Sequence, residues 1–178
     1  KNVDQARHGA EQADQRRHVA DAHQHGQIAL HFRHFELAGL LHDYCRELTD
    51  AETLAAAARH GIPVGPVEAR RPRQILHGPV AAAELLELGL SPDVAAAVRL
   101  HTVGAAGMTV LEKCVYLADF IEPGRAFAGL DEVRALAASS LDAAVAAAAR
   151  LSLLEVIGRG RGVVPAALAL YNESHAGQ

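Results

Sequence analysis

Tryptophan is absent from this chain of 178 residues, and other aromatic residues are scarce, with four phenylalanines and three tyrosines. Cysteine is rarer still, because Cys45 and Cys114 are the only two and they form no CxxC pair. A disulfide framework and a cysteine-rich zinc site are therefore excluded, which favours a reducing compartment. No apolar run reaches the roughly 18 residues needed to span a bilayer, and no leader segment is visible. We expect a cytoplasmic protein without a membrane partner.

An excess of positive charge is also lacking, since 17 Lys and Arg stand against 21 Asp and Glu and give a formal net charge of −4. A nucleic-acid-binding surface needs clustered positive charge, so no nucleic-acid partner is expected. Two short basic segments stand out, Arg70-Arg71-x-Arg73 and Arg159-x-Arg161. They are either solvated loop charges or contacts for phosphate groups, and the sequence leaves both interpretations open.

What the chain does have is alanine and leucine, which make up much of its 50% hydrophobic content and are strong helix formers. Strict apolar–polar alternation is rare, so strands are poorly supported. The sequence predicts an all-α fold with a single bundle of seven or more helices. Expected helices cover residues 36–47, 50–60, 73–88, 92–101, 110–122, 130–138, 141–157 and 165–173.

Local signals set several of these boundaries. Thr49 with Glu52, and Thr109 with Glu112, each have the spacing of a capping box at a helix start. Ser91 precedes a proline at a first helical position, which is a favourable N-cap. Pro79 falls inside the helix expected over residues 73–88, so that helix either begins at Gly78-Pro79 or kinks there.

Residues 1–34 differ from the rest of the chain. They contain six of its eleven histidines and show weak apolar periodicity, so no helix boundary is predicted in them. We treat residues 1–34 as a poorly matching N-terminal segment of the helical domain and residues 35–178 as the main domain.

The adjacent pair His42-Asp43 is the first candidate site. Imidazole nitrogen and carboxylate oxygen together suit Fe, Mn, Zn or Mg. Neighbouring residues of a helix point about 100° apart, so both reach one ion only near a helix end. The alternative is a polar pair on the exposed side of an amphipathic helix.

Three further residues strengthen the metal interpretation. Asp119 lies in the apolar segment VYLADFI, where a buried carboxylate needs a cation or an ion pair such as one with Arg125. His77 and His101 each lie at an expected helix end near a glycine, which permits close approach to a ligand. A single histidine of this kind is more often structural, but five such residues together indicate a site.

Longer segments resemble a known family: LAGLLHDYCREL, ILHGPVAA and AVRLHTVGAAGMTVLEKCVYLADFIEPGRAFAGLDEVR. They resemble the bacterial HD-domain symmetrical diadenosine tetraphosphatases (the YqeK family), in order and from about residue 36 to residue 172. A generic HD-superfamily protein would share only the His-Asp pair and the later aspartate. The resemblance implies an HD-type helical domain that converts diadenosine tetraphosphate into two ADP.

The resemblance also assigns roles residue by residue. His42, Asp43 and Asp119 match metal ligands, while His77 and His101 match histidines that face the phosphates directly or through a second metal. Asp43, His77 and His101 are thereby the catalytic candidates. The candidate substrate contacts are Arg125, Thr102, Gly104, Tyr171, Asn172 and Arg46, the last standing where the family commonly has lysine.

One expected ligand has no clear counterpart. The superfamily has a histidine ligand upstream of the His-Asp pair, and His18 in Arg16-Arg17-His18-Val19 is the most similar candidate. The composition of residues 1–34 reflects either divergence or a reading-frame error in the gene sequence. Intact-mass measurement of the protein separates these two hypotheses.

The resemblance implies a divalent transition metal, iron first, as one or two ions, with Mn, Co or Mg as alternatives. The expected partner is a nucleotide substrate, and a homodimer is allowed but not required. Two other functions stay open: another HD nucleotide phosphohydrolase such as a nucleotidase, and a non-catalytic helical regulatory protein with a vestigial metal site.

Overall fold

The computed structural model describes residues 32–176, of which those from Phe35 onward belong to one compact unit. Within residues 32–176 the regular structure is entirely helical, which confirms the predicted fold class. A first helix covers residues 32–41. It is followed by α2 (Asp50–Arg59), the 3-10 helix η1 (Glu68–Arg70), α3 (Pro72–Glu87), α4 (Pro92–Leu100), α5 (Val110–Phe120), α6 (Leu130–Ala137), α7 (Leu141–Gly158) and α8 (Pro165–Ser174).

The predicted caps are present. Thr49 and Thr109 each accept a hydrogen bond from the backbone of the third helical residue, whose glutamate side chain bonds back to the cap. The Ser91 side chain caps α4, and Pro92 takes the first helical position. These interactions satisfy backbone donors that a helix start leaves unpaired, so local sequence is enough to fix these three boundaries.

The helix expected over residues 36–47 is wrong at its C-terminal end, because the helix stops at residue 41. The ring of His42 donates from Nδ1 to the carbonyl of Gly39 at 2.7 Å. Beyond that point the backbone amides of Tyr44 and Arg46 bond to carbonyls three residues back, as in successive turns. His42 and Asp43 therefore lie on a tight turn and escape the fixed angular separation of neighbouring helical residues.

Helix α3 runs through Pro79 without interruption, so a start at Gly78-Pro79 is also wrong. Tertiary packing accounts for this, because α3 and α4 approach closely at Gly78. A Cβ at Gly78 would lie 2.9 Å from the carbonyl oxygen of Val98 and 3.2 Å from the His101 ring. The contact with α4 thus offsets the hydrogen bond that proline removes from the helix.

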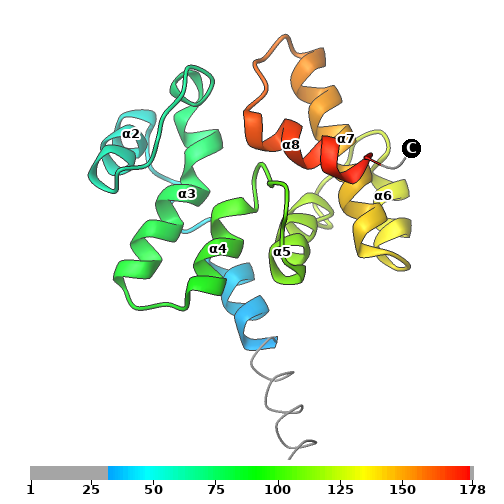
Figure 1. The fold of residues 1–178 in the computed structure, drawn as a ribbon, viewed down its shortest axis with the longest axis horizontal. Coiled ribbons are helices and arrows are strands. Elements are labelled where there is room, and N and C mark those ends of the chain that lie inside the picture. Colours follow the sequence, from blue (N-terminus) through cyan, green and yellow to red (C-terminus); the bar gives the residue numbers. More distant parts are fainter. Residues whose placement is uncertain (1–31, 177–178) are drawn as a thin grey trace, which may run out of the picture. The chain divides into compact units, whose positions relative to one another are not determined.

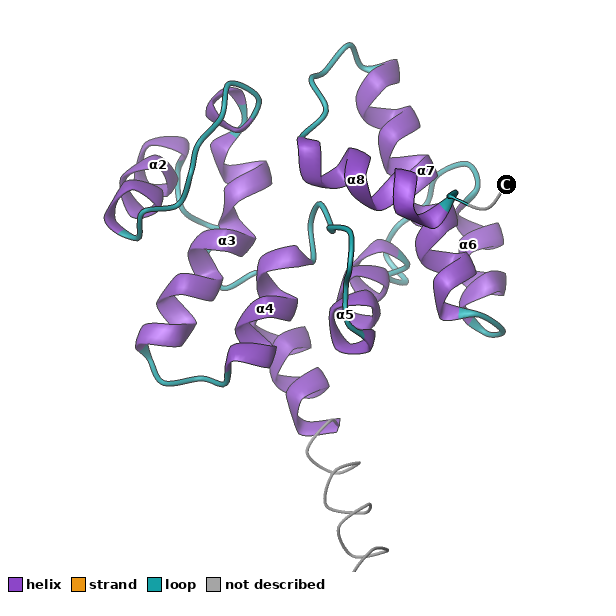
Figure 2. Cartoon of the chain, viewed as in Figure 1, coloured by secondary structure: helices purple, strands orange, loops and turns teal. Residues whose placement is uncertain are grey.

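Neighbouring helices pack in series, with α3 against α2 and α4, α4 against α5, and α7 against α5, α6 and α8 (Figure 1). The same view coloured by secondary structure shows the loops and turns that join these helices (Figure 2). One core cluster is built mainly from α2, α3 and α4, and a second from α5, α6, α7 and α8. Among the described residues, no helix is long and apolar enough to cross a membrane.

Candidate metal centre and active site

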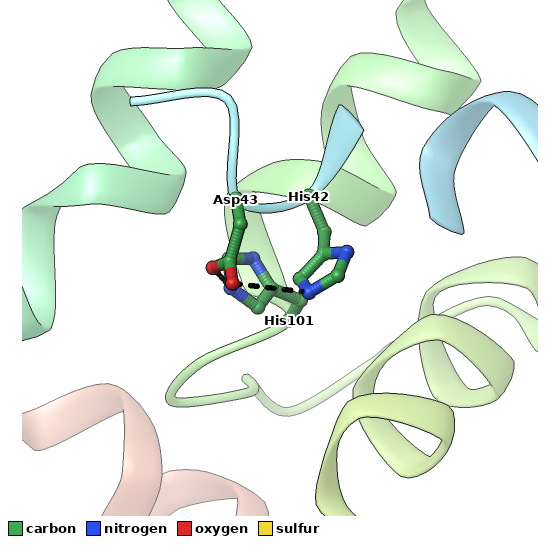
Figure 3. A group of neighbouring side chains, drawn as sticks. All are labelled: His42, Asp43 and His101. Carbon is green, nitrogen blue, oxygen red and sulfur yellow. Dashed lines mark ion pairs between the residues drawn. The ribbon is translucent and has the colours of Figure 1, made fainter. Parts of the chain in front are cut away.

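Four separate elements bring the predicted site residues together. His42 and Asp43 come from the turn after the first helix, His77 from the middle of α3, and His101 from the C-terminal cap of α4. Asp119 lies in the last turn of α5. Ligating atoms of His42, Asp43 and His101 all lie within 4.8 Å of one another, and Figure 3 shows the three side chains pointing toward a common point.

The orientation of each imidazole is fixed by a backbone carbonyl. Nδ1 of His42 lies 2.7 Å from the oxygen of Gly39, and Nδ1 of His101 lies 2.7 Å from that of Val98. Nδ1 of His77 makes the same kind of contact with Arg73 at 2.8 Å. A carbonyl oxygen only accepts, so each Nδ1 carries a hydrogen, and a ring in its neutral form presents an Nε2 lone pair. Metal-binding histidines have this arrangement.

The lone pairs of two rings face each other. Nε2 of His77 and Nε2 of His101 are 3.0 Å apart, and Thr102 Oγ1 lies 3.3 and 3.0 Å from them. The hydroxyl has one hydrogen and satisfies only one of the two acceptors. Burial lowers the pKa of His77 and lowers that of His101 to about 4, so both rings are neutral at pH 7.

Asp43 supplies the strongest indication that a cation belongs here. Its Oδ1 is buried and has no hydrogen-bond partner among the described residues, and it lies 3.2 Å from Nε2 of His77 and 3.6 Å from Nε2 of His101. Burial raises the pKa of this carboxyl, but the hydrogen bond from Arg46 and the positive charge nearby bring it below its usual range. An ionised oxygen facing two lone pairs fits bound divalent metal, as one ion or two, which would satisfy all three acceptors.

The other oxygens of the cluster bind arginine. Arg46 donates to Asp43 Oδ2 at 2.6 Å, and Arg125 donates to Asp119 Oδ1 at 2.6 Å. Asp119 Oδ1 also lies 3.8 Å from Nε2 of His42. Asp119 therefore lies at the edge of the cluster, shared between the histidine and the guanidinium group.

A cavity of about 1020 Å³ opens beside this cluster. Its walls include Arg46, His77, His101, Thr102, Asp119 and Arg125, so six of the predicted residues face one space. The cavity is larger than a metal ion and its ligands need, and it is within the range of small-molecule sites. The arrangement suits a ligand with several negative charges.

Three predicted substrate contacts lie elsewhere. Gly104, Tyr171 and Asn172 do not line the cavity. The Tyr171 ring stacks on His175 with centroids 4.3 Å apart, and the carbonyl of Asn172 accepts from the backbone of His175. A contact of these residues with substrate stays a prediction. His18 lies outside the described residues.

Sequence reasoning assigned no role to an aromatic wall of the cavity. Phe120 and Phe127 both line it, with their rings edge to face and centroids 5.4 Å apart. Phe127 is 45% exposed, which leaves part of its ring open to a ligand. The sequence held a usable signal for this wall. The chain has only four phenylalanines, and one of them, Phe127, lies in the segment GRAFAG, which is part of the family resemblance. Such a wall can stack on a planar base.

A second group of titratable side chains was also missed. His60 Nε2 lies 3.2 Å from Glu84 and its Nδ1 lies 3.3 Å from Glu87, while Arg59 pairs with Glu84. The spacing of His60, Glu84 and Glu87 would also permit a metal ion, but Arg59 already pairs with Glu84 and Glu87 is exposed. This group is an ion-pair network that joins the end of α2 to α3.

Comparisons with known proteins identify the family. The HD domain family model matches residues 9–124. A symmetrical bis(5'-nucleosyl)-tetraphosphatase from Bacillus subtilis is 36% identical over 139 residues, which cover 77% of this chain and 74% of the relative. The protein of that name from Halalkalibacterium halodurans is 31% identical, covering 78% and 74%, and that from Staphylococcus aureus is 39% identical, covering 57% and 53%.

A solved structure shares the fold. A protein from Clostridium acetobutylicum, described as a predicted HD superfamily hydrolase involved in NAD metabolism, superposes with a TM-score of 0.73. It is 30% identical, and the match covers 79% of this chain and 75% of that one. The family model, the relatives and the solved structure all indicate the same family. The chain therefore belongs to the HD domain family of hydrolases.

Proposed function

We propose that this protein hydrolyses a dinucleoside tetraphosphate symmetrically, with diadenosine tetraphosphate giving two molecules of ADP. The observation that carries the proposal is the unpartnered, ionised Oδ1 of Asp43, which faces the Nε2 atoms of His77 and His101 at the wall of an arginine-lined cavity. The names of the three bacterial relatives supply the reaction.

In this proposal His42, Asp43 and Asp119 hold the first metal ion, and His77 and His101 hold a second one. Direct binding of phosphate by His77 and His101 is disfavoured, because a neutral Nε2 lone pair repels a phosphate oxygen. When bound, such ions lower the pKa of water and polarise a phosphoryl oxygen. Iron is the first candidate by resemblance, with Mn, Co and Mg as alternatives that nitrogen and oxygen ligands also accept.

The side chains around the cluster have separate tasks. Water attacks one of the two inner phosphorus atoms, and the bridging bond at the middle of the chain breaks so that a nucleoside diphosphate leaves. Asp43 is placed to orient the attacking water beside the metal, and the proton of that water passes to bulk solvent. Arg125, at the cavity wall, neutralises charge that develops on the phosphoryl oxygens. A diphosphate is a good leaving group, so a strong general acid is not required.

The test is product analysis with a matched pair of variants. Wild-type protein loaded with Fe²⁺ or Mn²⁺ is incubated with diadenosine tetraphosphate, and nucleotides are separated by chromatography. ADP is expected as the sole product, and Asp43→Asn is expected to lower the rate by at least about 100-fold. Asp142→Asn, which removes a surface carboxylate paired with Lys113, is the control. ATP plus AMP would rule out symmetrical cleavage, and no product from metal-loaded wild type would rule out the enzyme.

A further inference from the structure

The arginines that line the cavity differ in whether a carboxylate pairs with them. Half of the arginines in the described part of the chain pair with a carboxylate, namely Arg46, Arg59, Arg125, Arg134, Arg150 and Arg159. Arg71 and Arg73 line the cavity and have no such partner among the described residues. In a chain of net charge −4, two uncompensated cations on one cavity wall are available for an anion from solution.

Arg73 lies at a defined distance from the metal cluster along α3. It precedes His77 by four residues, and its carbonyl accepts the hydrogen bond from His77 Nδ1. Residues four apart share a helix face and are separated by about 6 Å along the axis. The exposed Arg73 side chain is therefore one helical turn beyond the cluster on the same wall of the cavity.

Arg71 extends this wall toward the loop between α7 and α8. Its guanidinium group donates to the carbonyl oxygen of Gly162 at 3.4 Å, a long contact that leaves most of its donors unused. Arg159 lines the same part of the cavity but pairs with Glu155 at 3.1 Å. Among the described residues, Arg71 and Arg73 are thus the cavity arginines whose guanidinium groups pair with no carboxylate, although Asp50 accepts from the backbone amide of Arg73.

Symmetrical cleavage requires that two nucleoside diphosphate halves are held at once, and the metal cluster accounts for one of them. We propose that Arg71 and Arg73 form a distal phosphate subsite that binds the departing nucleoside diphosphate half of the substrate. This inference rests on the proposed function. It identifies these arginines as residues that favour a long polyphosphate chain over a mononucleotide, because only a chain that extends past the metal cluster reaches them.

The experiment compares Arg73→Gln, Arg73→Lys and Arg71→Gln with Arg99→Gln. Arg99 is the matched control, since it is exposed, has no carboxylate partner among the described residues and does not line the cavity. Steady-state kinetics on diadenosine tetraphosphate are combined with calorimetric binding of an analogue whose central bridging oxygen is replaced by methylene. The melting temperature of Arg71→Gln shows whether losing the contact with Gly162 also destabilises the fold.

We expect Arg73→Gln and Arg71→Gln each to raise KM, and Kd for the analogue, about tenfold, with kcat within about twofold of wild type. Arg73→Lys is expected to recover most of the loss, because it keeps the charge. Unchanged KM and Kd in both glutamine variants, or an equal loss in Arg99→Gln, would overturn the distal subsite while leaving the hydrolase intact. Wild type that binds the analogue but releases no ADP would overturn the proposed function, and Kd would still test the arginines.

Discussion

The Nε2 atoms of His77 and His101 lie 3.0 Å apart, although each ring donates its only hydrogen from Nδ1 to a backbone carbonyl. Two acceptors at this distance repel each other unless a cation or a donor lies between them. The Thr102 hydroxyl can donate its single hydrogen to only one of these two nitrogens. The protein thus holds these candidate metal-binding groups in place through the backbone of α3 and α4.

A divalent metal is therefore expected to stabilise the fold. At a metal concentration about 100 times Kd, linkage predicts about 2.7 kcal/mol, which raises the melting temperature by a few degrees for a domain of this size. His101→Gln is expected to remove most of that increase, because one Nε2 ligand is lost. Calorimetric melting with EDTA and with Mn²⁺ measures the difference.

His175→Gln is the control for that measurement, since His175 lies at the end of α8 and stacks on Tyr171 away from the cavity. It is expected to keep the full metal-dependent increase. An equal increase in wild type and His101→Gln would exclude His101 as a ligand.

Arg134 is expected to act on the site through Arg125. Its guanidinium group donates to the carbonyl oxygens of Ile121, Glu122 and Arg125 at 3.3, 2.9 and 3.2 Å, which holds the loop after α5. Arg134→Gln should release this loop and lower kcat about tenfold while metal content stays unchanged. Metal analysis of the purified variants and steady-state kinetics check both statements.

A double-mutant cycle separates this positioning role from a general loss of stability. If Arg134 acts by placing Arg125, Arg134→Gln should have little further effect on kcat once Arg125→Gln is present. Additive losses in the double variant would show that Arg134 does not act through Arg125.

Local sequence predicted the elements whose ends depend on local interactions. The caps at Thr49, Ser91 and Thr109 each need only a side chain and the next three residues, so spacing was sufficient. The helix end at residue 41 was missed because it coincides with the contact between the His42 ring and the Gly39 carbonyl. The unbroken α3 was missed because packing against α4 outweighs the local effect of Pro79.

In the candidate site too, some features follow from the sequence and others only from tertiary contacts. Motif order was enough to select His42, Asp43, His77, His101 and Asp119, which the fold brings together. The sequence did not reveal which arginines are paired, because partners such as Arg59 and Glu84 are distant in the chain. The uncompensated charge of Arg71 and Arg73 became visible only when the tertiary contacts were known.

The ion-pair network around Glu84 predicts a loss of stability in acid. The hydrogen bond with His60 and the nearby positive charges lower the pKa of Glu84 below its ordinary value of 4.5, and they outweigh the opposing effect of burial. A carboxyl with a lowered folded-state pKa adds stability above its unfolded-state pKa and loses it as pH falls through the folded-state value. Stability should therefore decrease below about pH 4.5.

Urea unfolding of wild type and Glu84→Gln measures this contribution. Partly exposed ion pairs contribute little, so the variant should lose about 0.5–1 kcal/mol at pH 7 and less at pH 3.5. Glu155→Gln removes an exposed partner of Arg159 within one helix and should change stability less. An equal loss in Glu84→Gln at both pH values would contradict the predicted contribution of its ionised form.

Gly104 and Gly61 offer a paired test of how tightly the loop after His101, a candidate catalytic residue, is packed. Both have left-handed backbone conformations, with φ of +67° and +64°. A Cβ at Gly61 meets nothing within 4 Å, whereas one at Gly104 collides with the Leu170 side chain and lies 3.4 Å from the Tyr116 ring. Gly61→Ala should cost about 1 kcal/mol from backbone strain alone, and Gly104→Ala about 3 kcal/mol, because Leu170 is buried and must move. Equal losses in urea unfolding would mean that Leu170 repacks freely.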